Sequence, residues 1–365
     1  MRIVRAVRSI LLIGPVATLV ASQAATPAAA QSDAFNPAIY RGADREQRIL
    51  DGARKEGQVT VYSSMIVDQA LRPLIDGFQT KYPFMKAPYV RDDPPQQLQK
   101  VMAEARAGNM VVDVLESTGL EVPIRNANIN QPFWSPEIEA YDKSHTDPES
   151  FWAPTRTSYL GACYNTNLVK PADVPKSFQD FLDPKWKGKI AWSSTVIGAM
   201  LFITGVRNFM GEEGALAYLK MLADQDIAPI ASANRVVVDR VMAGEYALCL
   251  DAFLHHPIIS ARKGAPVAPL PLDPILTVVS SVMLPKSPQH PFSAMLFIDY
   301  LLSKEGQQRL QAADYFPARL DVPSSPDLNA IVPAKIGLHE NFISPEKMNT
   351  ELAKSRALYQ ELFAR

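Results

Sequence analysis

Three short hydroxyl-rich segments are the groups in this sequence best placed for ligand chemistry. Each follows a run that predicts a β-strand, and they read Ser63-Ser64, Ser117-Thr118 and Ser193-Ser194-Thr195. Ligands of open α/β sheets bind at loops that leave the carboxyl ends of strands. The first and third segments lead towards predicted helices, whose unpaired N–H groups can hold an anion or a carbonyl oxygen. Helix capping by Ser and Thr is the structural alternative.

Charged and aromatic side chains flank two other predicted strands. Asp251, Phe253 and His255 come after one strand, and Arg156 and Tyr159 stand at the start of another. Arginine suits bidentate capture of a carboxylate or phosphonate, and aspartate can pair with a cationic ligand. Both residues are equally suited to internal salt bridges. The mixed signs leave an organic anion and an organic cation open as the ligand.

His255 and His256 are adjacent, which raises the question of a metal site. Neighbouring side chains point to opposite sides of an extended chain, and no third ligand stands nearby in the sequence. We therefore expect structural or supporting roles for the two histidines, with no bound metal and no cofactor.

The elements that must position these residues begin with a regular alternation. Apolar residues at helical spacing, ended by Gly or Pro, indicate helices, and β-branched or aromatic runs indicate strands. In chain order we predict helix 44–56, strand 59–62, helix 69–82, strand 87–90, helix 96–107 and strand 111–115. This order predicts a mostly parallel sheet covered by helices.

The remaining chain has a less regular order. Strands are predicted at 159–164, 190–192, 246–250 and 277–284, and helices at 211–222, 235–243, 291–302, 305–312 and 345–364. The proline-rich stretch 317–333 is expected to be extended.

Five segments, taken in order, resemble the iron(III)-type branch of bacterial periplasmic solute-binding proteins. They read GQVTVYSS, AGNMVVDVLEST, YLGACYNTNLV, SFQDFLDPKWKGKIAWSS and FIDYLLSKEGQQRL. The fourth, with its Trp-Lys-Gly-Lys turn before a strand, is similar to the most recognisable stretch of that family. The resemblance extends over roughly residues 44–364.

The resemblance implies an α/β, two-lobed type 2 periplasmic binding protein fold. Each lobe is expected to be a mixed sheet flanked by helices, with two hinge strands crossing between the lobes near residues 155–165 and 270–280. The expected divisions are lobe one at 31–158 and 277–325, lobe two at 159–276, and a C-terminal extension and helix at 326–365.

The implied function is that of the extracytoplasmic solute-binding component of an ABC importer. Such a protein captures a small polar or charged molecule in an interlobe cleft, closes by a hinge motion and delivers the molecule to the permease subunits. A protein that presents its ligand to a membrane sensor shares the fold and the cleft, so the sequence leaves this alternative open.

The ferric-binding members of that family use a ligand set that this chain lacks. They have a His or an acid after the first strand, a Glu after the third strand and a Tyr pair in the second lobe. Here the first loop has no His, Thr118 stands at the position of the Glu with Glu116 nearby, and residues 251–256 contain no Tyr. Because Fe(III) needs several anionic oxygens, direct ferric binding is not expected.

The N-terminus reads as a signal peptide over residues 1–30. Arg2, Arg5 and Arg8 precede the apolar stretch 10–20, and Ala28-Ala29-Ala30 offers the best cleavage site. We expect a periplasmic protein that is not inserted in the membrane after cleavage, since no later segment offers ~18 consecutive apolar residues.

The charge balance disfavours nucleic acid as a partner. The whole chain has a formal charge of −1, and loss of three leader arginines brings the mature chain to about −4. We expect a monomer whose partners are a small-molecule ligand and the permease subunits.

Cys163 and Cys249 are the two cysteines of the chain, and both lie in apolar, strand-like runs. We expect two buried, slow-reacting thiols, because cysteine is among the most buried residue types. A disulfide requires that their strands be neighbours, with the Cα atoms about 5.5 Å apart.

An enzyme is the main alternative class. The sequence contains no nucleophile elbow, P-loop, dinucleotide fingerprint or metalloprotease helix. The cysteines also lack an electropositive setting, so a catalytic thiol is not expected. We expect a binding protein and not an enzyme.

Overall fold

The structure, a computed structural model, describes residues 35–364. The predicted leader, residues 1–30, lies outside the described residues. Within the described range, no helix is both long enough and apolar enough to cross a bilayer.

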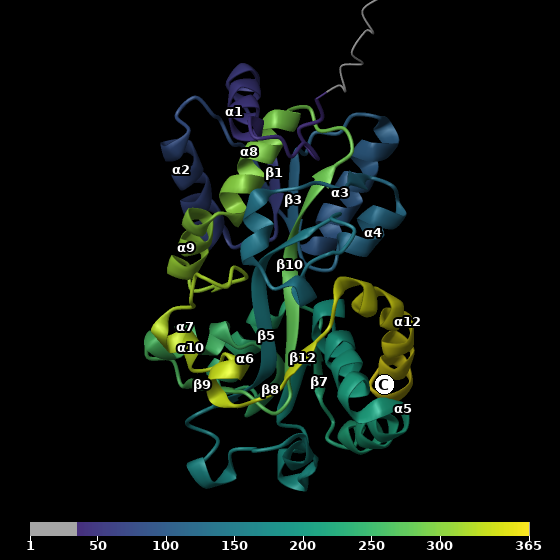
Figure 1. Cartoon of the computed structure of the whole chain (residues 1–365). Helices are drawn as coiled ribbons and strands as arrows, with labels where there is room; N and C mark the ends of the chain where they lie inside the picture. The colour runs from purple at the N-terminus through teal and green to yellow at the C-terminus, as the bar shows by residue number, and fades with distance from the viewer. Residues whose placement is uncertain (1–34, 365) are drawn as a thin grey trace, which may run out of the picture. The chain divides into compact units, whose positions relative to one another are not determined.

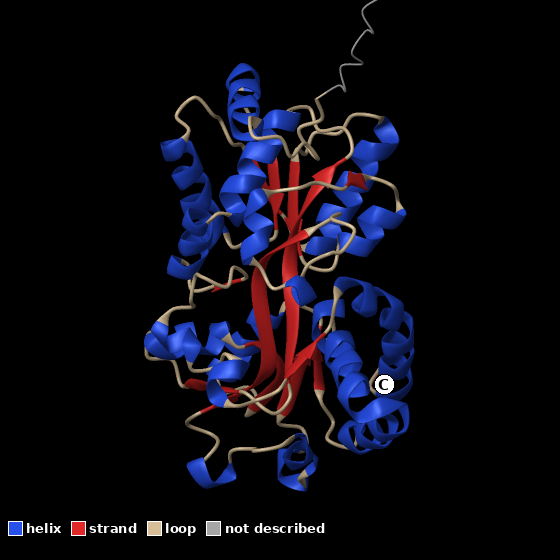
Figure 2. Ribbon diagram, viewed as in Figure 1, coloured by secondary structure: helices blue, strands red, loops and turns tan. Residues whose placement is uncertain are grey.

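The described residues form a 12-stranded mixed sheet with helices on both sides (Figures 1 and 2). Its main strand order is β2-β1-β3-β10-β5-β8-β6-β7. The strands are β1 Val61–Ser63, β2 Tyr89–Arg91, β3 Val114–Ser117, β4 Asn130–Gln131, β5 Ala153–Asn165, β6 Ile190–Ser193, β7 Ala228–Ile230, β8 Leu248–Phe253, β9 Val267–Leu270, β10 Ile275–Pro285, β11 Phe316–Pro317 and β12 Glu340–Phe342.

The helices alternate with strands most regularly in the first third of the chain. They are α1 Arg45–Glu56, α2 Arg72–Lys81, α3 Pro94–Ala107, α4 Glu121–Asn126, α5 Leu201–Ala223, α6 Asn234–Met242, α7 His255–Arg262, α8 Pro291–Leu302, α9 Lys304–Ala312, α10 Pro326–Asn329, α11 Pro333–Ile336 and α12 Pro345–Leu362. The predicted cap of the first helix is confirmed: Gly57 has a left-handed φ of 67° and donates its N–H to the Ala53 carbonyl.

Two long antiparallel strands, β5 and β10, connect the two ends of the sheet. Their register runs from Leu160 opposite Leu276 to Ala153 opposite Val282, with an irregularity between Ser280 and Ser281. The parallel strands β1, β2 and β3 lie at one end, and β6, β7 and β8 at the other. This arrangement confirms the two-lobed type 2 fold. The predicted lobe boundaries, 158/159 and 276/277, fall inside the two crossing strands.

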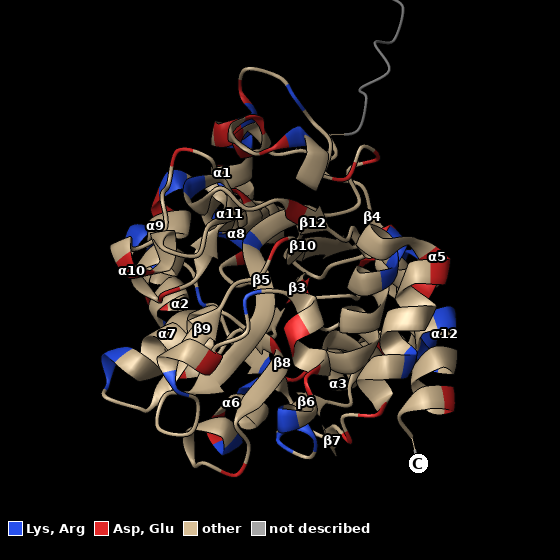
Figure 3. Cartoon of the chain, turned by 90° about the horizontal axis from the view of Figure 1, so that it is seen from below, with Lys and Arg blue, Asp and Glu red and all other residues tan. Residues whose placement is uncertain are grey.

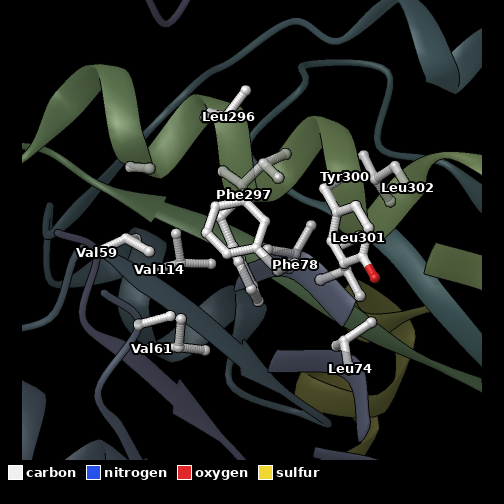
Figure 4. Packing of buried hydrophobic residues seen from close by; sticks show 14 of the residues in the cluster. Val59, Val61, Leu74, Phe78, Val114, Leu296, Phe297, Tyr300, Leu301 and Leu302 are labelled. Carbon is white, nitrogen blue, oxygen red and sulfur yellow. The ribbon is translucent and has the colours of Figure 1, made fainter. Parts of the chain in front are cut away.

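Lobe one is built on an aromatic and aliphatic core between the sheet and its helices (Figure 4). Phe78 of α2 contacts Phe297 and Tyr300 of α8, with ring centroids 5.0 and 5.4 Å apart. Val61 and Val114 contribute the sheet side of the same core. The helical spacing of apolar residues predicted from the sequence is what places these side chains together.

Lobe two has a separate core around Trp192 of β6. This fully buried ring packs near Phe202 of α5, with centroids 6.1 Å apart. The helix predicted at 211–222 is confirmed as the second segment of α5, which departs from helical geometry at Gly211 (φ 74°, ψ 171°), whereas the first segment, from Leu201, was not predicted. Its first turns are buried nearly all round, so they lack the polar face that an amphipathic pattern requires.

The stretch 317–333 is not simply extended, which corrects the sequence prediction. Its residues include the end of β11 and the short helix α10, and α11 begins at Pro333. Both helices start with Pro in the first turn, where proline is tolerated because that N–H would be unpaired anyway.

The C-terminal segment packs against both lobes. Strand β12 pairs in parallel with β10, and α12 follows directly. At the start of α12, Trp152 of lobe one donates its indole N–H to Glu346 at 3.2 Å. At the end of α12, Phe363 packs edge-on against Trp192 of lobe two, with centroids 4.6 Å apart.

Cys163 and Cys249 are buried, as predicted from their apolar flanks. They lie directly opposite each other on the antiparallel strands β5 and β8. Their sulfur atoms are 2.7 Å apart and unbonded in the structure.

Candidate ligand-binding site

The predicted hydroxyl residues do lie at strand ends. Ser63, Ser117 and Ser193 are the last residues of β1, β3 and β6. Asp251 and Phe253, however, lie inside β8 and not after it, because the strand continues to residue 253. His255 and His256 begin α7, so the assumption of an extended chain at this pair was wrong.

A buried ion pair between Arg156 and Glu116 organises the lobe-one residues. Glu116 also accepts a hydrogen bond from the Ser63 hydroxyl at 2.6 Å, and Arg156 donates to the Ser64 hydroxyl at 3.2 Å. Thr155 donates to Glu116 at 3.3 Å. These five residues are called the Arg156 cluster below. Within the described chain, none of its buried polar side-chain atoms lacks a partner.

Tyr315 lies between the Arg156 cluster and a histidine of lobe two. The Arg156 guanidinium carbon is 5.0 Å from the centre of the Tyr315 ring. The His255 ring is 5.5 Å from Tyr315 on an edge-on approach. Sequence reasoning missed Tyr315, although the aromatic pair Tyr315-Phe316 directly after a predicted helix was a usable signal.

A second polar group surrounds Asp251 in lobe two. Its carboxylate accepts the Ser193 backbone N–H at 2.8 Å, and the Ser193 and Thr195 hydroxyls are 2.8 Å apart. Asn234, at the start of α6, donates its amide to the Asp251 backbone carbonyl. These four residues are called the Asp251 cluster below. Asn234 was missed because only the fold brings it to β8.

The Asp251 carboxyl is buried, and only one of its two oxygens has a hydrogen-bond partner among the described residues. It is 1% exposed, and its Oδ1 has no hydrogen-bond partner among the described residues. Burial raises the pKa of Asp251 to about 8, although the Ser193 N–H acts in the opposite direction. The group is therefore mainly protonated at neutral pH, and it can donate a hydrogen bond as well as accept one.

Gly198 allows the chain after β6 to pass close to this carboxyl. A Cβ at this position would lie 2.2 Å from the Ser193 carbonyl oxygen and 2.7 Å from Asp251 Oδ2. Gly198 also departs from helical geometry, with φ −107° and ψ −114°. Any larger residue would push the helical turn Val196–Met200 off the Asp251 cluster.

The two histidines are buried and uncharged. Burial lowers the pKa of His255 well below its ordinary value, with further contributions from His256 and Arg156. Burial lowers the pKa of His256 to about 3. The Nδ1 atoms of both rings lack hydrogen-bond partners within the described range. Among residues 35–364, no three His, Cys, Asp or Glu side chains are arranged to hold a metal.

Several predicted residues make other contacts. The Tyr159 ring packs edge-on against Phe316 at 4.8 Å, in a mainly apolar cluster, and burial raises its pKa. Thr118 exchanges a hydrogen bond with Ser280 at 2.6 Å. The Ser117 hydroxyl is buried and has no partner among the described residues. None of these three hydroxyls hydrogen-bonds within the two clusters.

Ser194 and Phe253 border the lobe-two groups. A hydrogen bond to Ser194 opposes the rise that burial causes in the pKa of Tyr359 on α12. The Phe253 ring centre is 6.0 Å from that of His255 and 5.8 Å from that of His256. Phe253 thus covers the histidine pair with an apolar surface.

A small cavity adjoins Asp251 on its apolar side. Its volume is about 30 Å³, and its lining includes Gly161, Phe202 and Asn341. A cavity of this volume has room for at least one water molecule. Figure 3 shows both acidic and basic residues on α5 and α12.

Comparison with known proteins identifies relatives of this chain. The family described as bacterial extracellular solute-binding protein matches residues 108–337, more than half of the chain. A putative 2-aminoethylphosphonate-binding periplasmic protein of Salmonella typhi is 27% identical over 193 residues, which cover 49% of this chain and 55% of that protein. The major ferric iron-binding protein of Neisseria meningitidis is 29% identical over 170 residues, covering 45% and 49%. The chain thus spans about half the length of these curated relatives.

The fold is also that of solved periplasmic binding proteins. The binding protein AfuA of Actinobacillus pleuropneumoniae, solved with fructose-6-phosphate, has a TM-score of 0.69 at 20% identity. The similarity covers 84% of this chain and 98% of that one. On the family match over residues 108–337, this chain belongs to the bacterial extracellular solute-binding proteins.

Proposed function

We propose that this protein is the extracytoplasmic solute-binding component of an ABC importer. Its family consists of extracellular solute-binding proteins, and its fold is that of type 2 periplasmic binding proteins. The N-terminal pattern of three arginines, an apolar stretch and small residues supports export to the periplasm. In this proposal the protein is a monomer, performs no catalysis and delivers its ligand to permease subunits.

The observation that carries the proposal is the convergence of polar residues from both lobes at Tyr315. Arg156, on a crossing strand, and His255, at the start of α7, both contact this ring. A ligand that touches both residues would bind only when the lobes are close together. Differential affinity of this kind is what drives hinge closure.

The ligand that best fits these groups is a small polar organic molecule. Asp251 Oδ1 and the two histidine Nδ1 atoms are buried polar groups that lack partners among the described residues. A ligand with hydroxyl, amino or oxyanion groups would supply those partners, and unpaired buried polar groups are costly.

A bare ferric ion fits poorly, although some relatives are named for binding it. Glu116 is neutralised by Arg156, and Asp251 is mainly protonated because its pKa is raised to about 8. Both histidines are neutral. The described groups therefore supply too little negative charge to compensate Fe(III).

The test begins with a thermal-shift screen of the full chain against amino acids, polyamines, phosphonates, sugar phosphates, thiamine and ferric citrate. We expect an organic solute to raise the melting temperature, because a ligand that binds only the folded state stabilises it. Solution scattering should then show a smaller radius of gyration with that solute. A solute that is steadily converted to product would contradict the binding function.

Substitutions then test the place of binding. The double variant Ser194→Ala/Thr195→Ala should weaken affinity roughly ten- to a hundredfold, because each lost hydrogen bond costs about 0.5–1.5 kcal/mol or more. The matched control is Ser144→Ala/Thr146→Ala, which removes two hydroxyls from an exposed turn. Normal affinity in the first variant, with an unchanged melting temperature, would place the ligand elsewhere.

A further inference from the structure

A disulfide between Cys163 and Cys249 requires that their strands be neighbours, and the fold meets this requirement. Cys163 lies on β5 and Cys249 on β8, and these antiparallel strands place the two residues directly opposite each other. They are the two cysteines of the whole sequence. Their sulfur atoms are already 2.7 Å apart.

The backbone geometry is suited to a covalent bond. Directly opposed residues in an antiparallel pair have Cα atoms about 4.5–5.5 Å apart. Disulfides span Cα separations of about 4.4–6.8 Å, with a sulfur–sulfur bond of about 2.05 Å. Closing the bond therefore needs the sulfur atoms to approach each other by less than about 1 Å.

The surroundings favour a permanent bond over a reactive thiol. Both side chains are 0% exposed and lie in a lobe-two cluster with Ala191, Val238 and Ala252. Burial raises the pKa of the Cys249 thiol well above its ordinary value, and the contact with Cys163 adds to this effect. Because both sulfur atoms are fully buried, the folded pair is out of reach of oxidants and reductants in solution.

We propose that Cys163 and Cys249 form a structural disulfide in the mature protein. The bond closes during folding, before the pair is buried. Each thiol loses its proton and one electron as the sulfur–sulfur bond forms; the sulfur–sulfur bond of a disulfide oxidant breaks, and the oxidant takes up the two electrons and two protons to become two thiols. The source of that oxidant rests on the proposed export, since oxidising compartments allow disulfides to persist.

The bond would join a crossing strand to the strand that carries Asp251. The two cysteines are 86 residues apart in the chain, so the bond closes a long loop and restricts the unfolded state strongly. Cys249 precedes Asp251 by two residues on β8. The bond thus fixes β8 against β5 without touching the polar atoms of the Asp251 cluster.

The test is to refold the denatured, reduced full chain in a mixture of reduced and oxidised glutathione. Intact mass under denaturing, non-reducing conditions should fall by two hydrogen atoms, and thiol titration should find no free cysteine. Dithiothreitol should reverse the change in denaturant but not in buffer. Two free thiols, covalent dimers or glutathione adducts as the main product would overturn the proposal.

Stability measurements separate this bond from a chance oxidation. Oxidised wild type should melt about 5–10 °C above the reduced protein, because a long loop is closed. The variant Cys163→Ala/Cys249→Ala should show no difference between the two conditions. Equal melting temperatures for the oxidised and reduced wild type would also overturn the proposal. None of these readouts depends on a ligand or on export, so they stand apart from the tests of the proposed function.

Discussion

The Arg156 cluster and the Asp251 cluster solve the problem of buried charge in opposite ways. In lobe one, Arg156 and Glu116 neutralise each other, and surrounding hydroxyls complete their hydrogen bonds. In lobe two, Asp251 has no cationic partner among residues 35–364 and avoids the charge by holding its proton, since burial raises its pKa to about 8. One cluster is complete without a ligand, and the other leaves a buried oxygen unpaired.

The difference indicates separate roles for the two lobes. A complete cluster contributes mainly to the stability of the fold, and one with unpaired polar atoms has hydrogen-bonding capacity left for a ligand. We therefore expect substitutions in the Arg156 cluster to act on folding, and substitutions in the Asp251 cluster to act on binding and on pH dependence.

The largest expected effect is the loss of stability when the lobe-one ion pair is broken. Glu116→Gln removes the carboxylate and leaves Arg156 buried without its counter-charge, which should lower the free energy of unfolding by about 3–5 kcal/mol. Urea unfolding followed by circular dichroism measures this change. The matched control is Glu305→Gln at the exposed pair with Lys81, whose side chains are 40% and 41% exposed. The control should cost less than about 1 kcal/mol. Equal costs at both sites would remove the distinction between the clusters.

The next effect is the contribution of Asp251 to the pH dependence of stability. A carboxyl with a raised pKa stabilises the fold fully below its unfolded pKa, and that contribution is lost as the pH rises through the folded value. Wild type should therefore lose stability between pH 4 and pH 8, at up to about 1.4 kcal/mol per pH unit from Asp251.

The variant Asp251→Asn isolates this contribution. Asparagine keeps an oxygen for the Ser193 N–H but does not titrate. The loss of stability between pH 4 and pH 8 should therefore be smaller in the variant by a few kcal/mol. Glu121, whose pKa burial raises to about 7, contributes equally to both proteins and cancels from the comparison. Parallel stability–pH profiles for the two proteins would contradict the predicted proton on Asp251.

A smaller effect is expected from the tight turn over Asp251. In Gly198→Ala the new methyl group meets a backbone oxygen at 2.2 Å, so the turn must move, at a cost of about 1–3 kcal/mol. In Gly214→Ala, on α5, the nearest atom is 3.6 Å away. This control should gain about 0.5–1 kcal/mol from helix propensity. Thermal unfolding of the two variants checks the opposite signs.

Much of the fold could be predicted from local patterns. Residues 44–56 form a helix closed by Gly57, and the two crossing strands lie close to the predicted positions. Elements that depend on tertiary packing were missed. The start of α5 is buried almost all round, and α7 begins with two histidines of low intrinsic preference for helices.

The candidate site was harder to predict than the fold. Arg156 was expected either to bind a ligand or to form a salt bridge, and it pairs with Glu116, 40 residues away. Tyr315 and Asn234 reach the clusters through strand pairing and helix placement. Neither residue carries a local signal as strong as a hydroxyl-rich loop after a strand, so side-chain partnerships of this kind need the register of the sheet.

The position of α12 gives the protein two native fluorophores beside one helix. Trp152 of lobe one donates a hydrogen bond to Glu346 in the first turn of α12. Trp192 of lobe two packs against Phe363, just after the last turn of α12. Both indoles are buried. Release of the first turn from lobe one would bring water to Trp152 and shift its emission to longer wavelength, while Trp192 would keep its spectrum. Intrinsic fluorescence can therefore report a change between the lobes without any attached dye.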